Sequence, residues 1–220
     1  MAGAGRPTTG YRHRMLLALA TFTVAATLIV LLPGPDTLVT IRSIVRGGRS
    51  AGLATAAGIL VGLTIWISVA ALGLAAVLRA SEVAYAALRV LGAGYLVWLG
   101  LQSLRSVRRP ATIVADAGER RGLLGSGFAA GLVTNLLNPK VGVFFVTFLP
   151  GFVPSGYPVG LTSLVFGAVF IVLSVAYYLV LLGLATRVTG WMGTPRVRRR
   201  MDALTGTVLV GFGVRLALES

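Results

Sequence analysis

The sequence predicts an all-α integral membrane protein with six transmembrane helices, arranged as two inverted halves of three helices each. Three observations lead to this prediction: the composition, six apolar segments of membrane length, and a proline interruption in the first segment of each half. Of the 220 residues, 56% are hydrophobic and 12% are charged, and the mean hydropathy is +0.88. Soluble domains carry about a quarter charged residues, so this composition is typical of a chain embedded in lipid.

Six windows of about 20 apolar residues are each long enough to cross the hydrocarbon core of a bilayer. Because they use most of the chain, we expect a polar tail, residues 1–14, followed by a single six-helix domain, residues 15–220. Its halves, about 15–104 and 123–218, are joined by a basic loop, 105–122. The predicted segments are 15–32, 53–78, 83–104, 123–149, 159–186 and 203–218.

The first segment runs directly into Pro33, Gly34 and Pro35. Proline removes a backbone donor, and in hydrocarbon the freed groups are tolerated only where protein or a water-filled cavity satisfies them. A plain kink, or a loop at the membrane edge, would explain the same residues. As one straight helix, 15–41 would be about 40 Å long, which exceeds a core of about 30 Å. We therefore expect either an end near Pro33 and a short interfacial helix over 37–44, or a broken and tilted helix.

The fourth segment carries a similar interruption at Asn138 and Pro139. Laying residues 31–35 over 136–140 aligns the two interruptions. Because each half would hold an odd number of helices, the second half must enter the membrane in the opposite orientation. This inverted repeat is an architecture that many secondary transporters share, and two breaks predict a polar cavity between the halves.

The second, third, fifth and sixth segments are uninterrupted, and arginine distinguishes the connections between them. The net charge of +14 would suit nucleic-acid binding, but the arginines gather in the first, third and fifth connections. By the positive-inside rule these connections face the cytoplasm and both termini face outward, although the basic N-terminal tail argues against this orientation. No nucleic-acid partner is predicted. The arginines are Arg42, Arg46, Arg49, Arg105, Arg108, Arg109, Arg120, Arg121, Arg187, Arg196, Arg198, Arg199 and Arg200.

Several kinds of chemistry are excluded by composition. The chain has no cysteine, and its only histidine, His13, lies in the polar tail. Disulfides, thiolate nucleophiles and histidine-based metal sites within the membrane are therefore excluded. A single acid at membrane depth is too few for a catalytic carboxylate pair. We expect no enzyme activity, no cofactor and no metal site.

Two ionisable residues, Asp36 and Lys140, are not explained as flanks of the apolar segments, and such residues tend to line pathways. Asp36 suits the first turn of a helix that begins at Pro35, so a purely structural role is open. Lys140 follows Pro139 at a helix start, where the helix dipole disfavours a cation. We therefore expect a carboxylate, a substrate anion or the headgroup region to hold it. A direct bridge to Asp36 is not assumed, because the two residues lie at different depths of their segments.

Asn135 and Asn138 lie one turn apart beside the second interruption. They could supply amide groups to a pathway or satisfy the interrupted backbone. Pairs of glycines four residues apart, such as Gly58 with Gly62 and Gly127 with Gly131, predict close helix packing. The deeper aromatic residues, Trp66, Tyr177 and Tyr178, could face a substrate, although packing is the simpler explanation.

Several motifs together resemble a known family. In order along the chain they are PGPD at 33–36, a Gly-rich basic segment, GAGYLVWLG at 92–100 and NLLNPK at 135–140. From about residue 15 to 220, the chain resembles the lysine/threonine exporter (LysE-type) translocators. The signature residues of that family fall on Pro33, Gly34, Pro35, Asp36, Asn135, Asn138, Pro139 and Lys140.

The resemblance implies export of amino acids or their analogues through the bacterial inner membrane, driven by a proton or ion gradient, often by homodimers. Because family members differ in substrate, the family alone does not fix it. One acid and one base suit a zwitterion, so we favour neutral amino acids, with Asp36 accepting a proton or an ammonium group and Lys140 binding the carboxylate. The alternatives are an exporter of basic amino acids or metal cations, and a membrane interaction protein that transports nothing.

Overall fold

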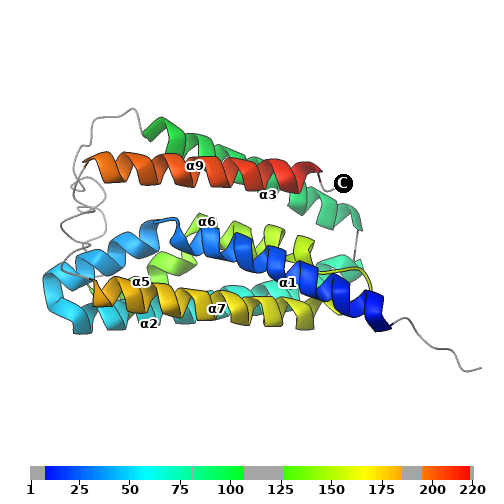
Figure 1. The fold of residues 1–220 in the computed structure, drawn as a ribbon, viewed down its shortest axis with the longest axis horizontal. Helices are drawn as coiled ribbons and strands as arrows, with labels where there is room; N and C mark the ends of the chain where they lie inside the picture. Colours follow the sequence, from blue (N-terminus) through cyan, green and yellow to red (C-terminus); the bar gives the residue numbers. More distant parts are fainter. Residues whose placement is uncertain (1–7, 81, 107–125, 185–194, 219–220) are drawn as a thin grey trace, which may run out of the picture.

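The structure is a computed structural model that describes residues 8–80, 82–106, 126–184 and 195–218. Every secondary-structure element in these ranges is a helix (Figure 1), so the predicted all-α class is confirmed. Most of the basic loop 105–122 and the first part of the tail 1–14 lie outside the described residues. The elements are α1 (Thr8–Leu31), α2 (Pro35–Ala80), α3 (Glu82–Ser106), α5 (Phe128–Leu136), α6 (Pro139–Val143), the π-helix η2 (Phe144–Phe148), the 3-10 helix η3 (Leu149–Phe152), α7 (Val159–Gly183) and α9 (Pro195–Leu218).

Three described stretches are long and apolar enough to cross a membrane, namely Tyr11–Leu31, Pro35–Gly73 and Val159–Gly183. A fourth results if Phe128–Leu136 and Pro139–Phe152, which meet at a bend of 53°, form one broken span. Helices α3 and α9 cover the predicted segments 83–104 and 203–218 without being among these stretches. The described residues therefore give three or four membrane-length stretches.

Helix α1 ends at Leu31, two residues before Pro33, as the proline predicts. The chain resumes as α2 at Pro35, and α2 is interrupted in turn by non-helical backbone at Gly47 and Gly48. Gly48 has φ 70°, a conformation that suits a residue without a Cβ atom. A short helical arm thus follows the first break, so the expected end near Pro33 and the short helix after it are confirmed, while its predicted interfacial position stays a prediction.

The two arms of α2 fold back on each other at this turn. The Thr55 hydroxyl donates to the Ser43 hydroxyl across the arms (2.8 Å), and the backbone N–H of Gly127, before α5, donates to the Thr55 hydroxyl (3.2 Å). Because polar groups at membrane depth are satisfied by protein or by water in a cavity, these two protein contacts help to fix the turn against the start of α5.

Glycines bring α2 and α5 together, as the sequence predicted. A Cβ atom added to Gly58 would collide with the carbonyl oxygen of Phe128, and one added to Gly131 with that of Thr55. At Gly62 it would lie 2.6 Å from the side-chain oxygen of Asn135. The close approach of these helices positions the second break, which follows α5, beside the first.

Helices α3 and α9 lie side by side along the bundle of α1, α2, α5, α6 and α7 (Figure 1). Glycine again allows the contact, because a Cβ atom on Gly100 would lie 2.7 Å from the carbonyl oxygen of Gly206. Phe212 of α9 packs on Phe148 of η2, with 4.6 Å between ring centroids. The core of the bundle is rich in phenylalanine; its fully buried rings are Phe22, Phe144, Phe145, Phe148 and Phe166.

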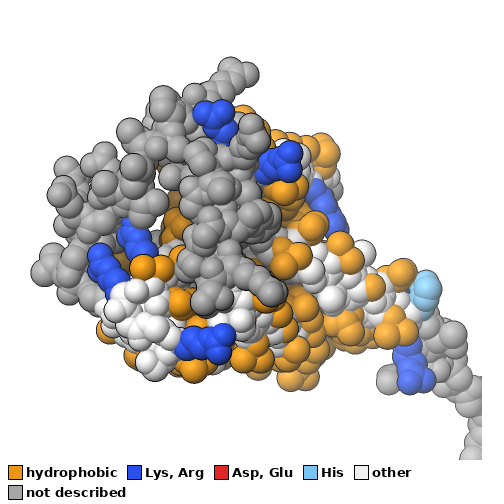
Figure 2. Space-filling view, turned by 60° about the vertical axis from the view of Figure 1, so that its left-hand side comes forward, with side chains coloured by type: hydrophobic (Ala, Val, Ile, Leu, Met, Phe, Trp, Pro, Cys, Tyr) orange, Lys and Arg blue, Asp and Glu red, His pale blue; other side chains and the backbone are white. Residues whose placement is uncertain are grey.

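Several arginines of the described residues lie at one end of the molecule, whereas Arg12 and Arg14 of α1 and Arg215 of α9 lie toward the opposite end. The turn of α2 at Gly47 and Gly48 lies at the same end as the end of α3 and the start of α9, whereas the start of α1 and the end of α9 lie at the opposite end (Figure 1). Figure 2, in which the end with the turn of α2 is turned toward the viewer, shows basic side chains on it. Arg46, Arg49 and Arg105 are exposed. This clustering fits the predicted grouping of the basic connections.

Candidate functional site

The two helix breaks meet inside the bundle, where their polar residues are buried. Asp36 is 8% exposed, Asn138 2% and Asn135 0%. The Asn135 side-chain amide donates to the Asp36 carboxylate, with 2.8 Å between Nδ2 and Oδ2. The structure therefore joins a predicted site residue of the first half to one of the second.

Asp36 lies in the first turn of α2, directly after Pro35 at the helix start. Proline suits this position because its missing N–H would have no partner there, and the helix dipole favours an acid. The neighbouring Thr37 hydroxyl lies 3.0 Å from the hydroxyl of Tyr177 on α7. The start of α2 is thus held from two sides, by α5 and by α7.

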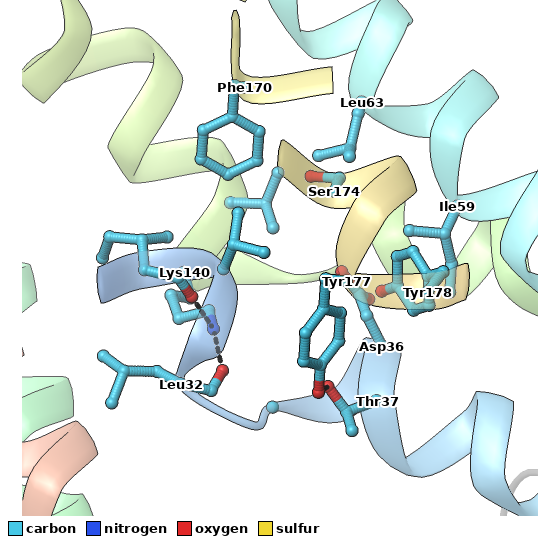
Figure 3. A pocket seen from close by; sticks show the side chains of 14 residues that line it. Leu32, Asp36, Thr37, Ile59, Leu63, Lys140, Phe170, Ser174, Tyr177 and Tyr178 are labelled. Carbon is cyan, nitrogen blue, oxygen red and sulfur yellow. Dashed lines mark hydrogen bonds between the residues drawn. The ribbon is translucent and has the colours of Figure 1, made fainter. Parts of the chain in front are cut away.

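Lys140 occupies the equivalent position in α6, after Pro139, but its side chain leaves its own helix. The ammonium group donates to the carbonyl oxygens of Leu32 (2.8 Å) and Ile29 (3.3 Å) at the end of α1 (Figure 3). The Ile29 carbonyl would ordinarily accept the N–H of residue 33, which proline lacks. Backbone carbonyls thus hold Lys140, where the sequence predicted a carboxylate, an anion or headgroups.

The dipole argument made for Lys140 from sequence is reversed by the length of its side chain. Four methylene groups carry the charge from the positive start of α6 to the negative end of α1, where a cation is favoured. Gly34 leaves room for this contact, since a Cβ atom there would lie 3.3 Å from the Lys140 nitrogen. This partner could have been anticipated from Pro33, which frees a carbonyl that must find a donor.

The two asparagines have different roles. Asn138 caps α6, because its side-chain oxygen accepts the backbone N–H of Lys140 (3.1 Å). It thereby satisfies the interrupted backbone, one of the two roles expected for it. Asn135 instead holds Asp36 with its side chain and accepts the Trp66 indole N–H with its carbonyl (3.3 Å).

Hydrogen-bonding capacity is left over in this cluster. Within the described ranges, the buried atoms Asp36 Oδ1, Asn135 Oδ1 and Asn138 Nδ2 have no hydrogen-bond partner. Buried polar atoms without a partner are rare in proteins, and each requires an explanation. At the meeting point of two broken helices, such atoms are available to a proton, a water molecule or a solute.

Asp36 and Lys140 line the same small cavity from opposite sides (Figure 3). Its volume is about 40 Å³, which is space for a few water molecules, since one needs ~10–15 Å³. The cavity is therefore too small for an amino acid as the helices now stand. Ser174, Tyr177 and Tyr178 of α7 complete its polar wall, so the tyrosine pair does face the interior.

A larger cavity of about 540 Å³ lies between the breaks and the α3–α9 pair. Lys140 lines this cavity as well as the small one, whereas Asp36 lines only the small one. Sequence analysis assigned no site role to the residues that α3 and α9 contribute, which include Trp98, Gln102 and Arg105. All four residues of the predicted helix-break motif line it: Pro33, Gly34, Pro35 and Pro139.

A bundle with membrane-length helices, two proline-broken helices and a buried acid, base and amide cluster at their meeting point is the arrangement of a membrane transporter. A family model confirms this class and makes it specific, since the LysE type translocator model matches residues 27–220. The chain belongs to the LysE type translocator family, and the resemblance seen in its motifs is thereby confirmed.

The relatives cover nearly the whole chain. The leucine efflux protein of Salmonella typhimurium is 32% identical over 203 residues, which are 90% of this chain and 93% of the relative. The uncharacterized membrane protein PA4757 of Pseudomonas aeruginosa is 32% identical over 206 residues, with 90% and 93% covered. The uncharacterized membrane protein YrhP of Bacillus subtilis is 28% identical over 210 residues, with 92% and 99% covered. No solved structure matches the chain.

Proposed function

We propose that this protein is a secondary transporter of the bacterial inner membrane that exports amino acids, preferably neutral ones, from the cytoplasm. Membership of the translocator family and the leucine efflux protein among its relatives support this function. The observation that carries the proposal is the pair Asp36 and Lys140, an acid and a base on opposite sides of one cavity where both broken helices meet.

A zwitterion carries the two charges that this pair complements. In the proposed binding mode the solute carboxylate takes the ammonium of Lys140, and the solute ammonium lies toward Asp36. Lys140 is reachable from the larger cavity, so the carboxylate binds first. Asp36 lines the small cavity and not the larger one, so its engagement requires the breaks to move apart.

Export against a concentration gradient needs an energy source, and we assign the coupling proton to Asp36. It is buried, and one carboxylate oxygen, Oδ1, has no hydrogen-bond partner in the described part of the chain. Asp36→Asn keeps the size and the helix start but cannot titrate. Efflux by this variant should lose its response to an imposed pH gradient, while exchange of solute at equal pH continues. Wild-type gradient dependence in Asp36→Asn would exclude the assignment.

We further propose six spans in a 3+3 inverted repeat, assembled as a homodimer. In support, α1 and α7 run in one direction along the molecule, while α9 and the long arm of α2 run in the other (Figure 1).

A single serine-to-cysteine change at each end of the molecule tests the orientation of the protein in the membrane. Ser50→Cys, at the arginine-rich end, should be protected from an impermeant thiol reagent in intact cells, and Ser155→Cys should react. The reverse pattern would invert the protein in the membrane.

The function itself is tested with purified protein in vesicles and a panel of radiolabelled amino acids. Neutral amino acids should exchange faster than lysine or arginine. If Lys140 binds the carboxylate, Lys140→Arg should raise the half-saturation concentration for an amino acid but affect its amide, which lacks the carboxylate, much less. Equal effects on acid and amide would reject the carboxylate role, and no exchange of any amino acid would reject the function.

A further inference from the structure

An apolar groove of about 690 Å³ runs beside the second break and is not used by the proposed binding of charges. It lies between α3 on one side and α2, α5, α6 and η2 on the other. Its volume lies in the range of small-molecule sites, which are mostly apolar with a few placed polar groups. Its lining includes Trp66, Tyr95, Leu137, Val143 and Val146.

The groove borders the larger cavity at the second break. Asn138 and Pro139 line both spaces, and Lys140, the next residue, lines the cavity. A solute whose carboxylate is at Lys140 therefore lies one residue along the chain from the two residues that line both spaces. Charge is available only on the cavity side, because no residue of the groove lining is ionisable apart from Tyr95.

The position of Trp66 in the groove is fixed by the site. Its indole N–H bonds to the carbonyl oxygen of Asn135, the residue whose side chain holds Asp36. The same ring packs on Gly142, where a Cβ atom would lie 2.9 Å from it. Hydrogen bonds thus connect the groove wall at Trp66, through Asn135, to Asp36. A side chain that shifts Trp66 would therefore also affect Asp36.

We infer that this groove receives the side chain of the transported amino acid, and that the substrates are amino acids with branched or aromatic apolar side chains. The inference rests on the proposed function and makes it more specific. Val143, Val146 and Trp66 are then specificity-determining residues. A charged side chain is rejected because the apolar lining cannot replace its water.

The test compares large and small substrates in one variant. Val146→Trp narrows the groove, so in vesicle exchange assays the half-saturation concentration for leucine and phenylalanine should rise about tenfold or more. Values for alanine and glycine should stay near wild type, because their side chains do not reach the groove. Val172→Trp is the matched control, since Val172 is 67% exposed on α7, and it should change neither class.

A second variant keeps the test decisive if Val146→Trp fails to insert. Val146→Ala widens the groove and should favour phenylalanine over leucine relative to wild type. An unchanged leucine-to-alanine ratio in the inserted variants, or an equal loss for both substrates, would overturn the inference and assign the groove to lipid. If wild-type protein exchanges no amino acid at all, the proposed function fails first, which is a distinct result.

Discussion

The two helix breaks begin alike and are held differently. After each break the helix resumes at a proline, Pro35 in α2 and Pro139 in α6, and the next residue is charged. At the second break the chain supplies its own cap, since Asn138 accepts the N–H of Lys140. At the first break, the carbonyls at the end of α1 are held by the ammonium of Lys140, which comes from the other half.

This difference indicates that the halves are interdependent in an unequal way. Each charged residue makes its hydrogen bonds to the opposite break. Asp36 of the first accepts from Asn135 of the second, and Lys140 of the second donates to the carbonyls of Ile29 and Leu32 at the first. The start of α6 is capped within its own half by Asn138, and the first half adds the indole N–H of Trp66 to the Asn135 carbonyl, whereas the carbonyls of the first break depend on a charged group of the second half. Disturbing Lys140 should therefore open the first break, and disturbing Asn138 should affect the second alone.

The largest effect is expected for Lys140→Met, which removes the hydrogen bonds that the second half supplies to the first break. The change leaves two buried carbonyls without a donor and removes a charge from the favourable end of α1. We expect a loss of about 3 kcal/mol in unfolding free energy, seen as a lower melting temperature in detergent. A lysine that merely opposed the dipole of α6 would give the opposite sign. Unchanged or increased stability would show that the first break needs no help from the second half.

Gly58→Ala should be next, because it forces the two breaks apart. The added methyl group would collide with the carbonyl oxygen of Phe128, so α5 must shift away from α2. Such overpacking costs about 2 kcal/mol, and exchange should slow as Asn135 moves off Asp36. Gly73→Ala, where nothing lies within 4 Å of the added atom, is the matched control and should be neutral. Equal melting temperatures of both variants would contradict the tight contact.

A double-mutant cycle of Asp36→Asn and Asn135→Ala sharpens the comparison from the acid side. If the 2.8 Å contact between these side chains is made to a charged carboxylate, the coupling free energy should be about 1.5 kcal/mol. It is measured from the melting of both single variants and the double variant. Additive effects of the two changes would show that the amide does not hold the acid.

The smallest effect is expected for Asn138→Ala, which removes the local cap of α6. Loss of such a cap destabilises a helix by about 1 kcal/mol, and Asn138→Asp, which can still cap, should restore most of it. The first break should be untouched, so protection of the α1 end from hydrogen exchange should match wild type. Deprotection of residues 29–32 in Asn138→Ala would mean that the cap of α6 also supports the first break.

Much of the fold follows from the sequence because hydropathy and proline act locally. The end of α1 near Pro33, the start of α6 at Pro139 and the glycine contacts of Gly58 and Gly131 were all predicted from short stretches. The sequence alignment of the two breaks differs from the structure by one residue. Matching the two Leu-Leu pairs aligned Gly34 with Pro139, whereas the helix that follows each break starts at Pro35 and at Pro139. Turn residues before a helix can differ in number without changing where the proline must lie.

What the sequence did not predict depends on contacts between distant segments. The reach of Lys140 to α1 cannot be inferred from its own helix, because a long side chain separates a charge from its backbone. The pairing of α3 with α9 and the groove beside Trp66 likewise join segments far apart in the chain. The π-helix Phe144–Phe148 has no distinctive local pattern, and its rings pack on those of α1, α7 and α9.

If a solute carboxylate binds Lys140 as proposed, the contact that holds the end of α1 also limits how strongly the solute binds. A carboxylate that takes the ammonium of Lys140 must separate it from the carbonyls of Ile29 and Leu32, and each acceptor left unpaired costs about 1–3 kcal/mol. Because 1.4 kcal/mol weakens binding tenfold, we expect half-saturation at about millimolar concentration. Such an exporter transports little while the intracellular solute concentration is low, and its rate rises once the solute accumulates to millimolar levels. A micromolar half-saturation constant for the best substrate in wild-type vesicles would exclude this behaviour.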